Sequence, residues 1–160
     1  MSLSRKIAAA LDARPHTDTL PADLSVAEGA DRLTLHLTAA APMGVAFDRL
    51  QFDSTLRESW TVESLRAWGD RVAKRLTYLM EPLVVIEVDA EAGEVELRSQ
   101  SPTPRDDRKS YYEVRLHRQG SLNLRRVAFD EATRRRSDVE CQLTREVLER
   151  LADDLVASVS

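Results

Sequence analysis

The chain has 160 residues, of which 42% are hydrophobic and 31% charged, and its formal net charge is −4. This length and composition are typical of one globular domain with a core of its own, and they exclude a disordered or fibrous protein. The longest strongly apolar stretch, Leu83 to Ile86, is far below the roughly 20 residues that a spanning helix needs, so we expect no membrane crossing.

The single cysteine, Cys141, and the N-terminal segment bear on the compartment. One cysteine cannot form an internal disulfide, and the sequence contains neither a CxxC motif nor paired metal-ligand spacing. The apolar run in MSLSRKIAAALDA is too short for a secretory signal peptide. We therefore expect a cytoplasmic protein in which residues 1–160 form a single domain.

The N-terminal segment predicts a short helix. Ser2 can cap it, apolar residues recur every four positions from Leu3 to Leu11, and Pro15 ends it. Residues 16–31 are rich in turn-forming residues and have no clean periodicity. We expect a connecting loop there, which need not be fully ordered.

Two strands are expected next. Residues 32–39 alternate leucine with polar side chains, which is the period of a half-buried strand. Residues 45–52 alternate less regularly, because Phe47 is followed by Leu50 and then Phe52. This irregularity indicates a bulge or an early end of the second strand.

The clearest predicted helix begins after Thr61. Thr61 is a candidate N-cap, and Trp60 and Leu65 have the spacing of a hydrophobic staple. One apolar stripe follows, and the helix is expected to end near Met80, two residues before a proline. The stripe consists of Leu65, Trp68, Val72, Leu76 and Leu79. Both tryptophans are therefore expected to pack in the core.

Residues 83–143 predict a series of sequential antiparallel strands joined by short turns. LVVIEVD and EVELRS flank a hairpin turn with Gly93, and YYEVRLHR and SLNLRRVAF flank a second turn with Gly120. A third turn leads into a strand over residues 137–143, where Cys141 alternates with polar neighbours. We expect Cys141 to lie on the core face of this strand.

Thr144 can cap a final helix whose apolar residues run from Val147 to Val159. The predicted fold is a single α+β domain in which a mainly antiparallel sheet packs against amphipathic helices, in the order α-β-β-α-β-β-β-β-β-α. This order is similar to that of the small acidic dimeric chaperones of bacterial type III secretion. The similarity concerns the element order alone, so it carries over no functional residue, but it implies a homodimer that captures a partner segment.

No group of residues in the sequence demands a particular chemistry. His16, His36 and His117 share no metal-ligand spacing, so we expect ordinary surface histidines. Cys141 is expected to be an inert core residue rather than a nucleophile, and the five glycines are too far apart for a phosphate loop. We therefore expect no catalytic residue, no metal site and no cofactor.

Basic residues are concentrated in one part of the chain. Residues 98–137 contain eleven basic and five acidic residues, a net charge of +6, which leaves −10 for the remainder. Strand alternation places charged and polar residues of three strands on one side of the sheet: Glu94, Glu96, Arg98, Glu113, Arg115, His117, Asn123 and Arg125. The candidate binding residues among them are Arg98, Arg115, His117 and Arg125.

This basic face has two interpretations. It can bind an anionic ligand, such as a peptide carboxylate or a phosphate. It can also be a solvated face whose arginines pair with acidic residues such as Glu113 on the neighbouring strand, and we favour this interpretation. Nucleic acid is not expected as a partner, because only Tyr111 adds an aromatic ring to this face.

The sequence thus predicts a non-enzymatic module that binds a protein partner or a second copy of itself. The alternative is a binder of an anion or a nucleic-acid segment that uses the basic sheet face in residues 98–137.

Overall fold

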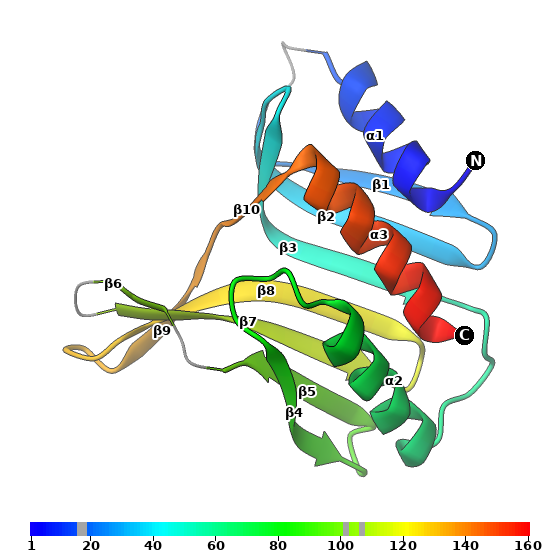
Figure 1. The fold of residues 1–160 in the computed structure, drawn as a ribbon, viewed down its shortest axis with the longest axis vertical. Coiled ribbons are helices and arrows are strands. Elements are labelled where there is room, and N and C mark those ends of the chain that lie inside the picture. Colours follow the sequence, from blue (N-terminus) through cyan, green and yellow to red (C-terminus); the bar gives the residue numbers. More distant parts are fainter. Residues whose placement is uncertain (16–18, 101–102, 106–107) are drawn as a thin grey trace.

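A single antiparallel sheet forms one layer of this computed structural model, which describes residues 1–15, 19–100, 103–105 and 108–160. Within these residues the sheet has ten strands, and three helices cover one of its faces (Figure 1). The helices are α1 (Leu3–Ala13), α2 (Val62–Arg75) and α3 (Arg145–Val159). The strands are β1 (Ala22–Glu28), β2 (Asp31–Ala40), β3 (Gly44–Ser54), β4 (Leu83–Asp89), β5 (Glu94–Ser99), β6 (Thr103–Arg105), β7 (Arg108–His117), β8 (Ser121–Asp130), β9 (Arg135–Val139) and β10 (Cys141–Thr144).

The sheet forks between β3 and β8. Its main strand order is β1-β2-β3-β8-β7-β5-β4, and β3 pairs with β8 only from Leu50 opposite Leu124 to Asp53 opposite Ser121. Beyond Leu50 and Leu124 the two strands take different partners, since β3 pairs with β10 and β8 pairs with β9. Residues 135–144 therefore pass from one branch of the fork to the other.

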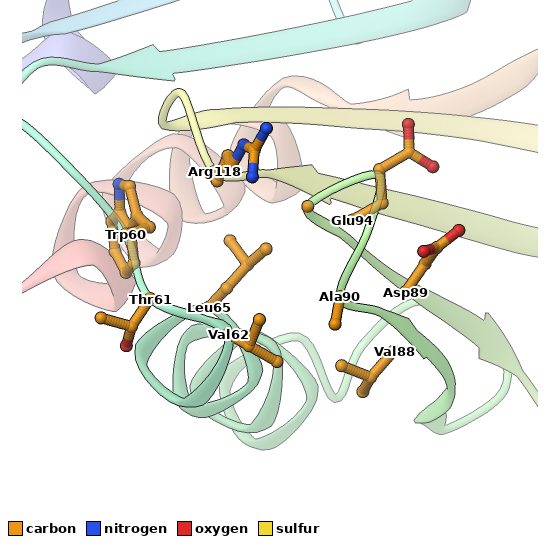
Figure 2. A pocket seen from close by; sticks show the side chains of 10 residues that line it. Trp60, Thr61, Val62, Leu65, Val88, Asp89, Ala90, Glu94 and Arg118 are labelled. Atoms are coloured by element: carbon orange, nitrogen blue, oxygen red, sulfur yellow. The ribbon is translucent and has the colours of Figure 1, made fainter.

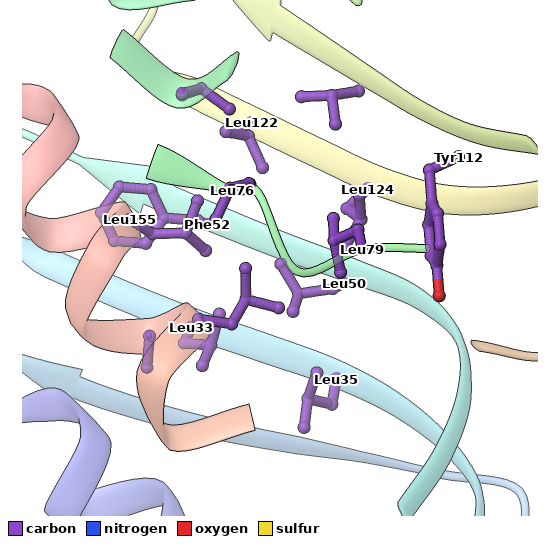
Figure 3. Close-up of a cluster of buried hydrophobic side chains, with 14 of the residues drawn as sticks. Leu33, Leu35, Leu50, Phe52, Leu76, Leu79, Tyr112, Leu122, Leu124 and Leu155 are labelled. Atoms are coloured by element: carbon purple, nitrogen blue, oxygen red, sulfur yellow. The ribbon is translucent and has the colours of Figure 1, made fainter. Parts of the chain in front are cut away.

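The helix-covered face of the sheet carries the hydrophobic core. Alternation brings leucine and phenylalanine side chains of β2, β3 and β8 to this face, where they meet side chains from the helices and from the segment after α2 (Figure 3). Trp68 is fully buried, and Trp60 stacks on it with the ring centroids 4.7 Å apart. Core packing of both tryptophans is thus confirmed.

The expected helix caps form, but α2 ends earlier than predicted. Thr61 accepts a hydrogen bond from the backbone N–H of Ser64, and the Ser64 hydroxyl accepts one from the Thr61 N–H, which completes a capping box. The helix ends at Arg75 rather than near Met80. The chain after it is not helical, yet Leu76 and Leu79 remain buried, so the predicted apolar stripe packs in the core beyond the helix end.

The predicted α+β class with a mainly antiparallel sheet is confirmed, and the structure adds strands to the predicted order. The connecting loop expected over residues 16–31 is wrong for residues 22–28, which form β1 against β2; His16 lies outside the described residues. The strand expected over residues 137–143 is split between β9 and β10. A short strand, β6, pairs with the start of β7.

Across the described ranges, each helix is too short or too polar to cross a membrane.

We expect Leu76→Ala to lower the free energy of unfolding by about 2–5 kcal/mol, because it leaves a cavity in a packed core. Leu76 is 1% exposed. Chemical denaturation of both proteins measures the difference, and Leu56→Ala is the control, since Leu56 is 57% exposed. A loss below about half a kcal/mol would contradict the packing described for Leu76.

Cys141 lies at the fork of the sheet, where β10 pairs with Phe47 of β3. The cysteine is fully buried, as predicted, and this burial raises the pKa of its thiol to about 12, although the positive charge of Arg126 opposes the shift. At neutral pH the side chain is therefore an uncharged thiol with no access to solvent, which makes it a poor nucleophile.

We expect Cys141 to react slowly with a thiol reagent in the native protein and rapidly after unfolding in denaturant. The absorbance of released thionitrobenzoate measures both rates. Stoichiometric labelling of the folded protein at the rate of the unfolded one would show that the thiol is accessible.

Candidate functional site

The four candidate binding residues lie on the face of the sheet opposite the helices. Arg98 of β5 and Arg125 of β8 flank Glu113 of β7 in one cross-strand row. Arg115 lies in the next row, opposite Glu96 of β5. His117 lies opposite Glu94 at the end of the same pair of strands. The alternation that placed all of these residues on one face is confirmed by this register.

Glu113 is the centre of an arginine cluster. Arg125 donates from Nε and Nη2 to Glu113 Oε2, at 2.9 and 2.8 Å, and Arg115 donates from Nε and Nη2 to Oε1, both at 3.2 Å. Arg136 of β9 adds a contact of 3.4 Å from Nη2 to Oε2. These guanidinium groups cover the carboxylate, so that its side chain is only 1% exposed although it lies on a face without helices.

A second carboxylate, Glu96, extends the cluster toward β5. Its oxygens accept from Arg98 Nη2 at 3.2 Å and from Arg115 Nη2 at 3.0 Å. Burial, followed by the hydrogen bond and the negative charge of Glu113, raises the pKa of Glu96. Burial also acts to raise the pKa of Glu113, but the hydrogen bond from Glu96 and the hydrogen bonds and charges of the arginines hold it below its usual value.

The structure brings three of the four candidate residues together. Arg98, Arg115 and Arg125 are linked through Glu96 and Glu113. His117 is separate, since its Nε2 lies 3.4 Å from Glu94. We therefore define the arginine cluster as Arg98, Arg115, Arg125 and Arg136 with Glu96 and Glu113.

The aromatic ring on this face is covered by the same arginines. The guanidinium carbon of Arg98 lies 4.8 Å from the centroid of Tyr111, and that of Arg136 lies 5.8 Å from it. Tyr111 is only 7% exposed. The ring therefore supports two cations and offers no surface on which a nucleic-acid base can stack.

A crevice of about 260 Å³ opens beside the cluster at the fork of the sheet. Because β3 and β8 stop pairing at Leu50 and Leu124, the next residue on each strand, Arg49 and Arg125, stands at the point where the strands separate. The crevice is lined by Arg49, Glu113, Arg115, Asn123, Leu124 and Arg125. We call it the fork crevice.

The fork crevice has an excess of positive charge. Its lining includes three guanidinium groups and one carboxylate, that of Glu113. Arg49 is exposed and makes no ion pair with any residue that the structure describes, and the adjacent Asp48 is bonded to His36 Nδ1. The Arg115 side chain is 44% exposed although it is bonded to the cluster, so part of its guanidinium can still meet a ligand. Such an arrangement can bind an anionic group by charge-assisted hydrogen bonds.

The site contains no arrangement suited to covalent or metal chemistry. Its polar groups are guanidinium, carboxylate and amide, and the buried Cys141 thiol is protonated at neutral pH. The described part of the chain holds no group of three or more histidine, cysteine, aspartate or glutamate side chains placed to bind a metal ion.

Arg49 and Arg136 were missed by the sequence reasoning. Arg49 reaches the site because β3 pairs with β8, two strands that are separated in the described chain by α2 and by the four strands β4 to β7. Arg136 lies near Glu113 because β9 pairs with β8 in a hairpin. It was missed because the strand predicted from SDVECQL begins one residue after it. Only the hairpin could have been anticipated, since the pairing of β3 with β8 leaves no local signal.

We expect Glu113→Gln to lower the free energy of unfolding at pH 7 by about 1–3 kcal/mol, because it removes the charge that the surrounding guanidinium groups bind. Removing one partner of a fully buried ion pair destabilises a protein by more than this. Here the loss is smaller, because the three arginines are each over a third exposed and solvent screens their charges. Glu96→Gln is the control, because its raised pKa means that its charge is already disfavoured, and it should cost less. Urea denaturation measures both, and an equal or larger loss in Glu96→Gln would contradict the central role of Glu113.

The stability difference between the wild type and Glu113→Gln should depend on pH. The pKa of Glu113 is lower in the folded state than in the unfolded chain, so its stabilisation is fully present above the ordinary glutamate pKa. It is lost as the pH falls through the lowered value. The stability difference between the wild type and Glu113→Gln should therefore shrink in acid, and a difference that grows there would contradict the assignment.

Comparisons of the chain with protein families, with curated proteins and with solved structures gave no match.

Proposed function

We propose that this protein is a non-enzymatic binding module whose fork crevice receives a carboxylate from an acidic segment of a partner protein. The observation that carries the proposal is the charge of the crevice lining, three guanidinium groups against one carboxylate, with Arg49 free of ion pairs in the described structure. A bound carboxylate supplies the missing negative charge and accepts the unused N–H groups.

The arginine cluster holds two of these guanidinium groups in place before any partner arrives. Arg115 and Arg125 are each bonded to Glu113 through two nitrogens. Less side-chain entropy is lost on binding when the donors are already ordered. Glu113 thus supports binding although it repels an anion, because it positions the groups that attract one.

An acidic protein segment fits the surroundings better than a nucleic acid does. The same sheet face carries acidic side chains away from the crevice, among them Asp53 and Glu94, and the whole chain has a net charge of −4. A long polyphosphate would be repelled by these groups, whereas one or two carboxylates reach only the crevice. Tyr111, covered by Arg98 and Arg136, adds no stacking surface.

A labelled eight-residue peptide rich in glutamate and aspartate tests the proposal by fluorescence anisotropy. We expect binding that weakens with added salt and that is lost with the matching glutamine and asparagine peptide. Arg49→Gln should weaken binding by about tenfold, the value of one charge-assisted hydrogen bond. Arg66→Gln is the matched control, since it removes the same charge from an exposed position on α2, on the other side of the sheet.

Three results would contradict the proposal. They are equal affinity for the acidic and the neutral peptide, equal weakening by Arg49→Gln and Arg66→Gln, and tighter binding of a single-stranded oligonucleotide at the same salt concentration. Static light scattering on the free protein separately measures the self-association that the sequence predicts, so that a second copy is distinguished from a foreign partner.

A further inference from the structure

A second cavity, of about 230 Å³, lies between the start of α2 and the turn that joins β4 to β5 (Figure 2). It has no residue in common with the fork crevice. We call it the α2–β4 pocket. It is lined by Trp60, Thr61, Val62, Leu65, Val88, Asp89, Ala90, Gly93, Glu94 and Arg118.

Apolar side chains form part of the wall of the α2–β4 pocket. Leu65 is 2% exposed and Trp60 is 6% exposed, and the stacking of Trp60 on Trp68 fixes its ring. Val62 is 39% exposed at the edge of the pocket. In Figure 2, Val62 and Val88 lie on one side of the cavity, with Leu65 between them and Arg118. Val62 and Val88 therefore supply apolar surface that a small hydrophobic group can cover, beside the small exposed part of Trp60.

Arg118 provides a positioned positive charge. Its backbone N–H donates to Gly93 O at 3.0 Å, and its side chain lies directly over Gly93, where an added Cβ would be 2.5 Å from Arg118 Cδ. Gly93 also has a φ of +67°, which few other residues adopt. The aliphatic part of the Arg118 side chain therefore packs against Gly93. Its guanidinium makes no hydrogen bond or ion pair with the residues described.

The two carboxylates of the lining are already engaged. Asp89 Oδ1 accepts a hydrogen bond from the backbone N–H of Ala92 at 3.0 Å, and Glu94 lies 3.4 Å from His117 Nε2. Figure 2 shows both carboxylates directed away from Trp60 and Leu65. Arg118 is thus the charged group of the lining whose side chain has no hydrogen-bond or ion-pair partner among the residues described.

We propose that the α2–β4 pocket binds a small ligand in which a carboxylate is joined to a short aromatic or aliphatic group. The carboxylate pairs with Arg118, and the apolar group packs against Val62 and Val88, beside Trp60. The pocket is smaller than the roughly 300 Å³ at which sites for drug-sized molecules begin, so its ligand is a small acid or the last residue of a peptide chain. This site is independent of the function proposed for the fork crevice.

Phenylacetate and N-acetylphenylalanine are suitable probes, with phenylacetamide and N-acetylphenylalaninamide as neutral controls. Tryptophan fluorescence, to which Trp60 and Trp68 both contribute, reports on occupancy. The NMR signal of the Trp60 indole N–H, which is buried without a hydrogen-bond partner in the described structure, assigns the change to this pocket. We expect each acid to bind at least about tenfold more tightly than its amide, as for one charge-assisted pair. Tighter binding of N-acetylphenylalanine than of phenylacetate identifies a chain terminus as the source, and the reverse identifies a free acid.

Variants separate the two parts of the pocket. Arg118→Gln should abolish the preference for the acids, whereas Arg66→Gln should leave it unchanged. Ala90→Leu places a larger side chain in the pocket from an exposed position, and it should weaken the binding of acids and amides equally. Equal affinity of acid and amide in the wild type, or an unchanged preference in Arg118→Gln, would overturn the proposal.

Discussion

The pairing of β3 with β8 over four residues joins the two branches of the sheet. On the covered face it brings Leu50 and Phe52 together with Leu122 and Leu124, so that the two branches share one core (Figure 3). On the other face it sets Arg49 beside Arg125 at the point where the strands separate. Both the core and the fork crevice therefore depend on this short ladder, and the bent segment of β9 and β10 supplies partners for the strand ends that the ladder leaves unpaired.

The arginine cluster shows how a charged group can be buried on a face that no helix covers. Glu113 is removed from solvent by the side chains of its own neighbours rather than by another layer of the fold. Each guanidinium offers several N–H groups, so the carboxylate is well satisfied while some donors still face outward. The cluster thus combines charge compensation at its centre with an uncompensated edge at Arg49. The sequence favoured a solvated face whose arginines pair with acidic residues, and this describes the arginines around Glu113. The proposed binding site lies beside them, at Arg49.

Local patterns predicted most of the fold. Alternation placed β2, β5, β7 and β8 correctly, and Thr61 and Thr144 cap the helices as expected. The strand β1 was not predicted, because only Leu24 and Val26 alternate in it and turn-forming residues surround them. The strand is stabilised by its pairing with β2. The end of α2 was misplaced because Leu76 and Leu79 keep helical spacing while packing from a non-helical segment. Only part of the site could be predicted from the sequence. Arg98, Arg115 and Arg125 lie on strands that are joined by short connections, whereas Arg49 comes close through the pairing of β3 with β8, which are far apart in the sequence.

The fork also determines the order in which this chain can assemble. The hairpins β2–β3 and β7–β8 close short loops, and little chain entropy is lost when they form. Contact between Leu50 and Leu124 instead closes a loop between positions 74 residues apart. Ladders with such long sequence separation form late and slow the folding of the whole domain. Until that ladder closes, each half exposes the edge of an unfinished sheet, so the newly made chain is most prone to aggregate at the strands that later define the fork crevice.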